Sequence, residues 1–129
     1  MVRRFDLTID CADPAALARF WADALAYPSA GIEEDPDNAG AMLAPPADGL
    51  PLVYFQRVPE GKVAKNRVHL DLKVGGEGPL EDRKARIDAE AARLVALGAS
   101  DRRGPIAEGG SYWVRMHDPE DNEFCLVSG

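Results

Sequence analysis

Side chains that can do chemistry stand at alternate positions in two segments of this sequence. The first segment places Asp6, Thr8 and Asp10 on one side, and the second places His69, Asp71 and Lys73 there. Because imidazole titrates near neutral pH, we expect His69 to act as a catalytic general base or as a ligand-binding group. The alternative is that His69 hydrogen-bonds Asp6 or Gln56 and holds the two halves of the chain in register. Thr8, Asp10 and Asp71 are expected to contact a small-molecule ligand.

A third segment also alternates in character, near the end of the chain. Trp113 and Arg115 alternate there with Tyr112, Val114 and Met116. One of these two sets must face the ligand site, and the pattern leaves open which set does so. Indole and guanidinium groups would suit a planar anionic or aromatic ligand.

Three further residues have a structural explanation beside a functional one. Tyr54 stands between Leu52 and Gln56, and the mixed character of this strand is typical of a partly enclosed pocket wall. Cys125 is expected to be a small buried apolar residue rather than a nucleophile, since no cation or helix N-terminus is evident beside it. His117 precedes an Asp-Pro pair at a strand end, which favours a role in a turn over catalysis.

The elements that carry these residues repeat in the two halves of the chain. Strict alternation predicts strands over residues 5–11 and 67–74, and helical spacing predicts a helix of about three turns after Asp13-Pro14 and another over residues 80–97. Short strands are expected at residues 52–58, 99–103, 112–116 and 124–127. The order of strand, helix and short strands indicates two similar βαβββ modules, about residues 1–60 and 66–129, joined by a polar linker.

Neither module can bury both faces of its sheet by itself, because one face meets the helix and the other carries polar side chains. We therefore expect an α+β fold in which the two modules pair into a curved mixed sheet around a cleft. The chain of 129 residues is expected to form one domain.

Composition limits the partners. A formal net charge of −7, with scattered lysines and arginines, argues against nucleic acid as a partner. No apolar run approaches the roughly 20 residues that span a bilayer, and no secretory leader pattern is evident, so we expect no membrane partner and a cytoplasmic location. The distant Cys11 and Cys125 are expected to be reduced thiols.

Four runs of the sequence resemble the glyoxalase-like branch of the vicinal-oxygen-chelate superfamily, which also includes bleomycin-resistance proteins and dioxygenases. They are DCADPAALARFWADAL, FQRVPEGK, NRVHLDLKV and DPEDNEFCLVSG. They match in order and cover most of the chain, apart from residues 30–50 and 104–111. The last run has Asp121 where the family has glycine, so we expect a local Asx-type turn at this position.

The resemblance implies a metal site built from the first and last strands of each module. Those family positions fall on Asp6, Gln56, His69 and Cys125. Enzymes of this kind use a divalent ion such as Zn, Ni, Mn or Fe, but a neutral amide and a soft thiol make an awkward set for carbonyl or dioxygen chemistry. Glu123 is two residues from the expected carboxylate position and would substitute only if the register shifted.

The resemblance and the incomplete metal set together favour a small-molecule-binding protein that uses the cleft without a complete catalytic metal site. Modest lyase-like activity is compatible with this function. The alternative is a metal-dependent lyase, isomerase or dioxygenase acting on a small carbonyl or aromatic substrate, in which His69 moves a proton. Because the family often pairs two chains, a homodimer is expected.

Overall fold

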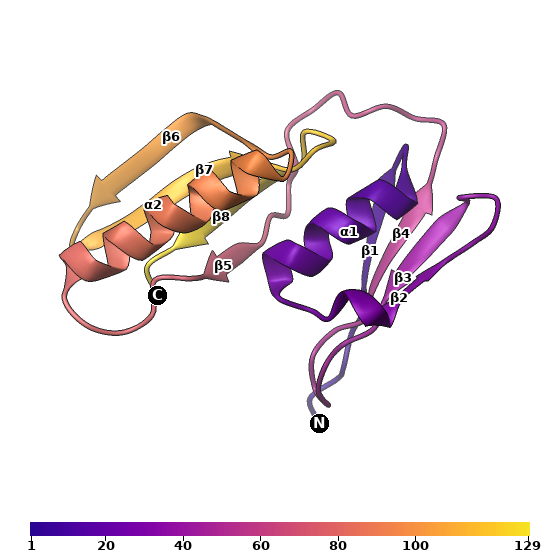
Figure 1. Cartoon of the computed structure of the whole chain (residues 1–129), viewed down its shortest axis with the longest axis horizontal. Coiled ribbons are helices and arrows are strands. Elements are labelled where there is room, and N and C mark those ends of the chain that lie inside the picture. The colour runs from indigo at the N-terminus through magenta and orange to yellow at the C-terminus, as the bar shows by residue number, and fades with distance from the viewer. The chain divides into compact units, whose positions relative to one another are not determined.

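The computed structural model describes residues 1–129, which divide into two compact units, residues 1–61 and 62–129. Each unit has a four-stranded sheet with one long helix (Figure 1).

The first unit contains the elements of one βαβββ module. They are β1 (Leu7–Cys11), α1 (Pro14–Leu25), the short 3₁₀ helix η1 (Ser29–Gly31), β2 (Ile32–Glu34), β3 (Gly40–Leu43) and β4 (Val53–Arg57). The strand order is β1-β4-β3-β2. β1 runs parallel to β4, whereas the other pairs are antiparallel, so the sheet is mixed.

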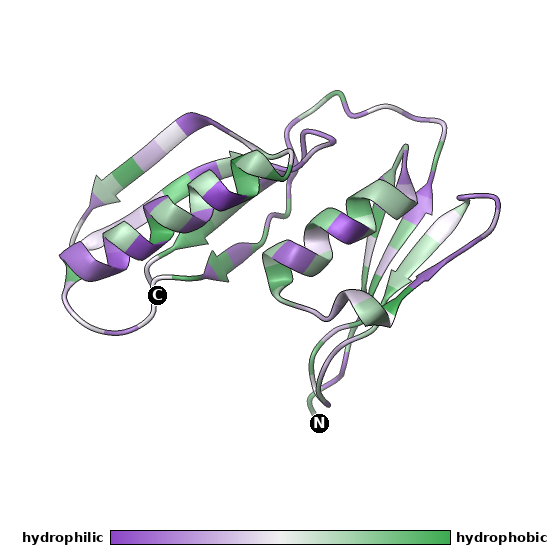
Figure 2. Ribbon diagram, viewed as in Figure 1, coloured by the Kyte–Doolittle hydropathy of each residue, from purple (hydrophilic) through white to green (hydrophobic).

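Helix α1 forms where a cap and a regular apolar stripe coincide. The Asp13 side chain accepts a hydrogen bond from the Ala16 amide at 3.3 Å, and Pro14 occupies the first helical position. Leu17 and Trp21 are buried on the inner side of the helix, which contacts β3 and β4. Figure 2 shows both long helices as mixtures of hydrophobic and hydrophilic residues, as helices that cover one face of a sheet require.

The second unit repeats this order. It contains β5 (Asp71–Lys73), α2 (Leu80–Ala96), β6 (Ser100–Glu108), β7 (Ser111–His117) and β8 (Glu123–Val127), with the strand order β5-β8-β7-β6. β5 is parallel to β8, and the remaining pairs are antiparallel. Ile87, Ala91 and Leu94 form the buried stripe of α2, which contacts β7.

The α+β class and the two βαβββ modules are therefore confirmed, and both helices begin where the sequence predicts. The prediction of a strand over residues 67–74 was wrong in extent, since β5 has only three residues. β6 is longer than predicted and has an irregular register between Ser100 and Gly104. The pairing of the modules around a common cleft stays a prediction. No helix is both long and apolar enough to cross a bilayer.

Candidate functional site

The face of the second sheet that lies opposite α2 carries most of the functional groups of this unit. Residues that are paired across neighbouring strands point to the same side of a sheet. Asp71 pairs with Cys125, and Cys125 pairs with Arg115. These three side chains therefore form one row across β5, β8 and β7 on the open face.

The structure decides which residues of β7 face this side. Tyr112, Val114 and Met116 are buried in the core, whereas Trp113 and Arg115 are half-buried. Because α2 contacts β7, the buried set packs toward the helix. Trp113 and Arg115 consequently lie on the open face. Of the two sets of β7 residues that the sequence left open, this is the one whose indole and guanidinium groups suit a planar ligand.

A concavity of about 440 Å³ lies on this face, at the end toward the C-terminus. Its lining includes His69, Asp71, Lys73, Trp113 and Cys125. Lys73 belongs to the same alternating series as His69 and Asp71, and this alternation is the sequence signal that finds it. Ser128 also lines the concavity, but it follows β8 and belongs to no alternating pattern, so the sequence gives no signal for it.

His69, Asp71 and Cys125 form a close cluster within this concavity. His69 Nε2 lies 3.4 Å from Asp71 Oδ1, and one potential ligand atom from each of the three residues lies within 4.8 Å of the others. Burial raises the pKa of the Cys125 thiol, and the Asp71 carboxylate raises it further. The free thiol is therefore protonated at neutral pH and is a poor nucleophile by itself.

Arg115 is held by the main chain of the neighbouring strand. Its guanidinium donates a hydrogen bond to the carbonyl oxygen of Gly104 at 3.4 Å and another to the carbonyl oxygen of Arg103. These contacts connect β7 to the irregular part of β6. The Arg115 side chain thus stabilises this part of the sheet, and it is absent from the lining of the concavity.

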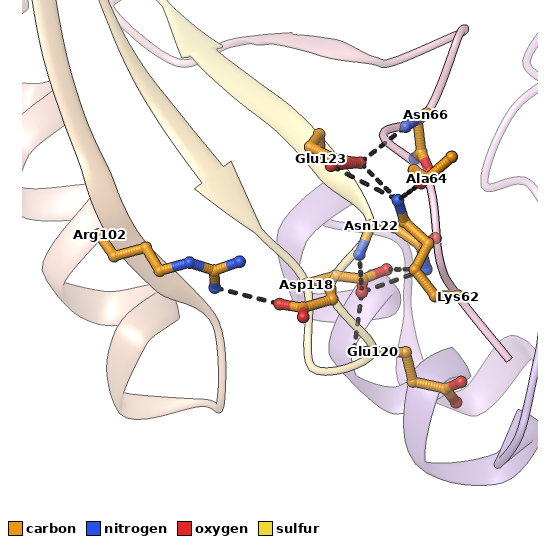
Figure 3. Close-up of polar contacts among 9 residues, drawn as sticks. Lys62, Ala64, Asn66, Arg102, Asp118, Glu120, Asn122 and Glu123 are labelled. Carbon is orange, nitrogen blue, oxygen red and sulfur yellow. Dashed lines mark hydrogen bonds and ion pairs between the residues drawn. The ribbon is translucent and has the colours of Figure 1, made fainter.

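Glu123 is engaged in contacts with the segment that leads into β5. Its Oε1 accepts a hydrogen bond from the Asn66 amide at 2.9 Å and lies 3.0 Å from Lys62 Nζ (Figure 3). Burial by itself raises the pKa of Glu123, but these donors outweigh it and lower the pKa to about 2. Glu123 is therefore a structural anchor, and β8 keeps the register that places Cys125 beside Asp71.

His117 lies at the end of β7, paired with Glu123 of β8. Its side chain is 3% exposed, and its Nδ1 atom is buried with no hydrogen-bond partner. Burial lowers the pKa of His117, and the nearby Arg102 lowers it further. In the turn that follows, the Asp118 side chain accepts hydrogen bonds from the amides of Glu120 and Asn122, so the local geometry supports a structural role for this region.

The first unit holds the remaining predicted site residues, which are Asp6, Thr8, Asp10, Tyr54 and Gln56. Thr8 pairs with Tyr54 and Asp10 pairs with Gln56 across the parallel strands β1 and β4, so these four side chains share one face. Asp6 precedes β1 and accepts a hydrogen bond from the Leu52 amide at 3.3 Å. Since Asp6 and Gln56 lie about four residues apart along the strands, or roughly 13 Å, the structure does not bring this pair together.

A second concavity, of about 470 Å³, lies beside the start of β1. Of the five predicted site residues of the first unit, its lining includes Asp6 alone. Arg4 and Asp48, which also line it, form a two-point ion pair at 2.5 and 2.9 Å. Both side chains are well exposed, so this ion pair contributes little to stability.

The two mixed sheets, each with one helix in βαβββ order, define the class of the protein as a duplicated α+β module. A family model described as a glyoxalase-like domain matches residues 6–127. The chain therefore belongs to the glyoxalase-like domain family, within the vicinal-oxygen-chelate superfamily that the sequence indicated. No curated protein matches the sequence.

Solved structures with the same fold are similar over nearly the whole chain. A hypothetical protein from S. aureus has a TM-score of 0.68 and 16% identity, covering 100% of this chain and 95% of its own. The fosfomycin resistance protein FosX from Mesorhizobium loti has a TM-score of 0.64 and 16% identity. The match covers 100% of this chain and 92% of the FosX chain. A FosX from Listeria monocytogenes, in complex with Mn(II) and sulfate ion, has a TM-score of 0.62 and 12% identity. The match covers 100% of this chain and 92% of the Listeria chain. At these identities the likeness concerns the fold alone.

Proposed function

We propose that this protein binds a small molecule in the concavity of the second sheet. The observation that carries the proposal is the lining itself, in which the Trp113 indole, the Lys73 ammonium group and the His69 imidazole occur together in about 440 Å³. A volume of this size is within the range of small-ligand sites. The fosfomycin resistance proteins with the same fold support a small-molecule function, since their names refer to resistance against a small molecule.

The lining favours a planar aromatic or carbonyl compound that carries a carboxylate. Trp113 offers a flat apolar surface, and Lys73 offers a positive charge for the carboxylate. In an enzyme of lyase type, His69 would serve as the general base because its imidazole lines the same concavity and is 43% exposed. Thr8, Asp10 and Tyr54, on the open face of the first sheet, stay predicted ligand contacts.

Tryptophan fluorescence tests this proposal with benzoate, 2-hydroxybenzoate and catechol as probes. Trp21 is 3% exposed in the core of the first unit, so a saturable change in emission is expected to report on Trp113. Trp113→Phe should abolish the change, and Lys73→Ala should weaken binding of the two carboxylates more than that of catechol. Arg19→Ala, which removes a cation from the surface of the first unit, should leave binding unchanged. Absence of saturable binding for all three probes, or equal binding by the Lys73 variant, would contradict the proposal.

The cluster of His69, Asp71 and Cys125 favours a metal-dependent enzyme as the second candidate. Imidazole, carboxylate and thiol groups all occur as ligands of divalent ions, and the three groups lie close enough for a shared ion. When bound, a divalent ion would supply a Lewis acid for a carbonyl substrate. His69 would then be a ligand, and this role excludes the general-base role in the first candidate.

Metal analysis separates the two candidates. Protein purified without chelator is compared with its His69→Ala variant. A stoichiometric divalent ion that the variant loses would favour the enzyme, whereas metal-free protein that binds the aromatic probes would favour the binding function.

The homodimer and the cytoplasmic location also stay proposals. Light scattering after size-exclusion chromatography tests the homodimer.

A further inference from the structure

We propose that Glu123 and His117 form a proton-controlled latch that holds the linker segment, residues 62–66, against the second sheet. Neutral His117 leaves the Glu123 carboxylate to the linker segment, and protonated His117 draws that carboxylate away. The latch lies within the second unit and needs no ligand, so this inference does not rest on the proposed function.

The latch is closed in the structure by two contacts to one carboxylate. The Asn66 main-chain amide donates a hydrogen bond to Glu123 Oε1 at 2.9 Å, and Lys62 Nζ lies 3.0 Å from the same atom (Figure 3). The Glu123 side chain is only 14% exposed, so its ion pair with Lys62 is screened less than a surface pair. Both ends of the linker segment therefore depend on where this carboxylate points.

His117 stands directly across from Glu123. The two residues are partners in the antiparallel ladder of β7 and β8, so their side chains leave the sheet on the same face with Cβ atoms about 5 Å apart. His117 is buried, and no other buried side-chain nitrogen or oxygen atom shares the condition of its Nδ1, which has no hydrogen-bond partner. A protonated imidazole carries an N–H group on both nitrogens. Protonation therefore places a charged donor beside Glu123, where an unpaired charge is costly.

The charges around His117 set the pH range of the latch. The imidazole faces Arg102 and Arg103 from β6, Asp121 from the turn after β7, and Glu123 from β8, which has Lys62 as its ion partner. Helix α2 packs on the opposite face of the sheet. Burial lowers the pKa of His117 and Arg102 lowers it further, whereas Glu123 raises it. His117 is therefore neutral at neutral pH and takes up a proton only below about 6.5, the ordinary histidine value.

Glu123 is the acceptor that a protonated His117 can use. The Asp118 carboxylate, next to His117 in sequence, already accepts two main-chain hydrogen bonds in the turn. The Asp121 side chain is well exposed and forms an ion pair with Arg102 at 3.1 Å. Rotation of the Glu123 side chain toward its cross-strand partner would satisfy the new N–H group, and the linker segment would lose both of its contacts.

An open latch would free the segment that leads to the concavity. His69 lines the concavity and follows Asn66 by three residues. Beyond Asn66, the chain is next tied to the sheet at Leu70, whose carbonyl oxygen accepts a hydrogen bond from the Cys125 amide at 2.9 Å. Release at Glu123 therefore leaves this stretch anchored at Leu70 and free before it.

Amide hydrogen exchange, resolved by NMR on the full chain, tests the latch without any ligand. The readout is the protection of the Asn66 amide relative to its intrinsic exchange rate at each pH. In the wild type, this protection should fall by about tenfold between about pH 7.5 and about pH 5, the effect of losing one hydrogen bond to a charged group. The Ser128 amide, bonded to the Tyr112 carbonyl oxygen at 3.1 Å at the other end of β7 and β8, should keep its protection.

Three variants identify the groups responsible. His117→Phe should keep Asn66 protected at both pH values, because the ring cannot take up a proton. The chain has two histidines, so His69→Ala is the matched control and should retain the acid loss of protection. Glu123→Gln should show low protection at both pH values. Circular dichroism checks folding, and His117→Gln replaces the phenylalanine variant if that protein is misfolded.

The outcomes separate a local latch from general acid sensitivity. Equal protection of Asn66 at the two pH values in the wild type would overturn the proposal, as would an acid loss that survives in His117→Phe. An equal acid loss at the Ser128 amide would assign the effect to opening of the whole sheet and would also overturn it. Binding of the aromatic probes is measured separately, so the latch and the proposed function fail independently.

Discussion

Glu123 at the start of β8 accepts a hydrogen bond from the main-chain amide of Asn66 at 2.9 Å (Figure 3). This contact joins the sheet to the segment that precedes His69. Lys62 Nζ lies 3.0 Å from the same oxygen atom, and the Glu123 side chain is only 14% exposed. One carboxylate therefore holds both ends of residues 62–66 against the second sheet.

Glu123→Gln should reduce the free energy of unfolding at neutral pH by about 1–2 kcal/mol, because the amide loses the charge that both donors recognise. The hydrogen bonds lower the pKa of Glu123 to about 2 in spite of burial, so the wild-type advantage is present above pH 4.5 and is lost as the pH falls toward 2. Urea unfolding of both proteins across this range measures the difference. Equal stability at neutral pH would show that the anchor has no energetic importance.

His117 should make the protein less stable in mild acid. Its pKa is lowered by burial and then by Arg102, so the contribution of the neutral imidazole is present above the ordinary histidine pKa of about 6.5 and is lost as the pH falls below it. His117→Phe keeps a ring of similar size and removes the unpartnered Nδ1 atom. Thermal unfolding at about pH 7.5 and about pH 5.5 should show a smaller loss for the variant than for the wild type. An equal loss in both proteins would assign the acid sensitivity to other groups.

Tyr112 connects β7 to α2 through a hydrogen bond that its hydroxyl group donates to Asp88 Oδ1 at 2.5 Å. Burial and this carboxylate raise the pKa of Tyr112 to about 12. The stabilisation is therefore present below about pH 10, the ordinary tyrosine value, and is lost as the pH rises toward 12. Tyr112→Phe should cost about 1–2 kcal/mol at neutral pH and should remove the last step of the tyrosinate absorbance titration. Retention of that step would assign it to another tyrosine.

The turn between β7 and β8 depends on Asp118. Its Oδ1 atom accepts hydrogen bonds from the amides of Glu120 and Asn122, at 2.8 and 2.9 Å, so the Asx-type turn is made by Asp118 and not by Asp121 as the sequence suggested. Asp118→Ala should cost about 2–3 kcal/mol, because it leaves main-chain amides without partners. Urea unfolding measures this loss, and a cost near zero would contradict the role.

Asp121 in the same turn adopts a φ of 71°, a conformation that favours glycine. Its ion pair with Arg102 is exposed on both sides and contributes little. Asp121→Gly should therefore be neutral or stabilising by about 0.5 kcal/mol, whereas Asp121→Ala should be destabilising. Denaturation curves of the two variants compare them directly, and greater stability of the alanine variant would contradict the backbone argument.

The helices were predictable from local sequence because their signals are local. Asp13 and Pro14 mark the beginning of α1, and the apolar stripe of Ile87, Ala91 and Leu94 marks the inner face of α2. The strands were less well predicted. The alternation from residue 67 onward continues through a segment that makes no ladder before Asp71, since a strand also requires a partner at the right register.

The sequence by itself determined the repeated order of elements and singled out His69 and Asp71 as site candidates, since hydrophobic periodicity and residue type are written in the chain. Cys125 became a candidate metal ligand through the family resemblance, whereas its own pattern indicated a buried apolar residue. Only the tertiary structure decided that Trp113 faces the open side of the sheet, that Asp71 stands opposite Cys125, and that Glu123 binds the linker. The physical reason is that strand register and side-chain partners arise from contacts between residues far apart in sequence, which no local pattern records.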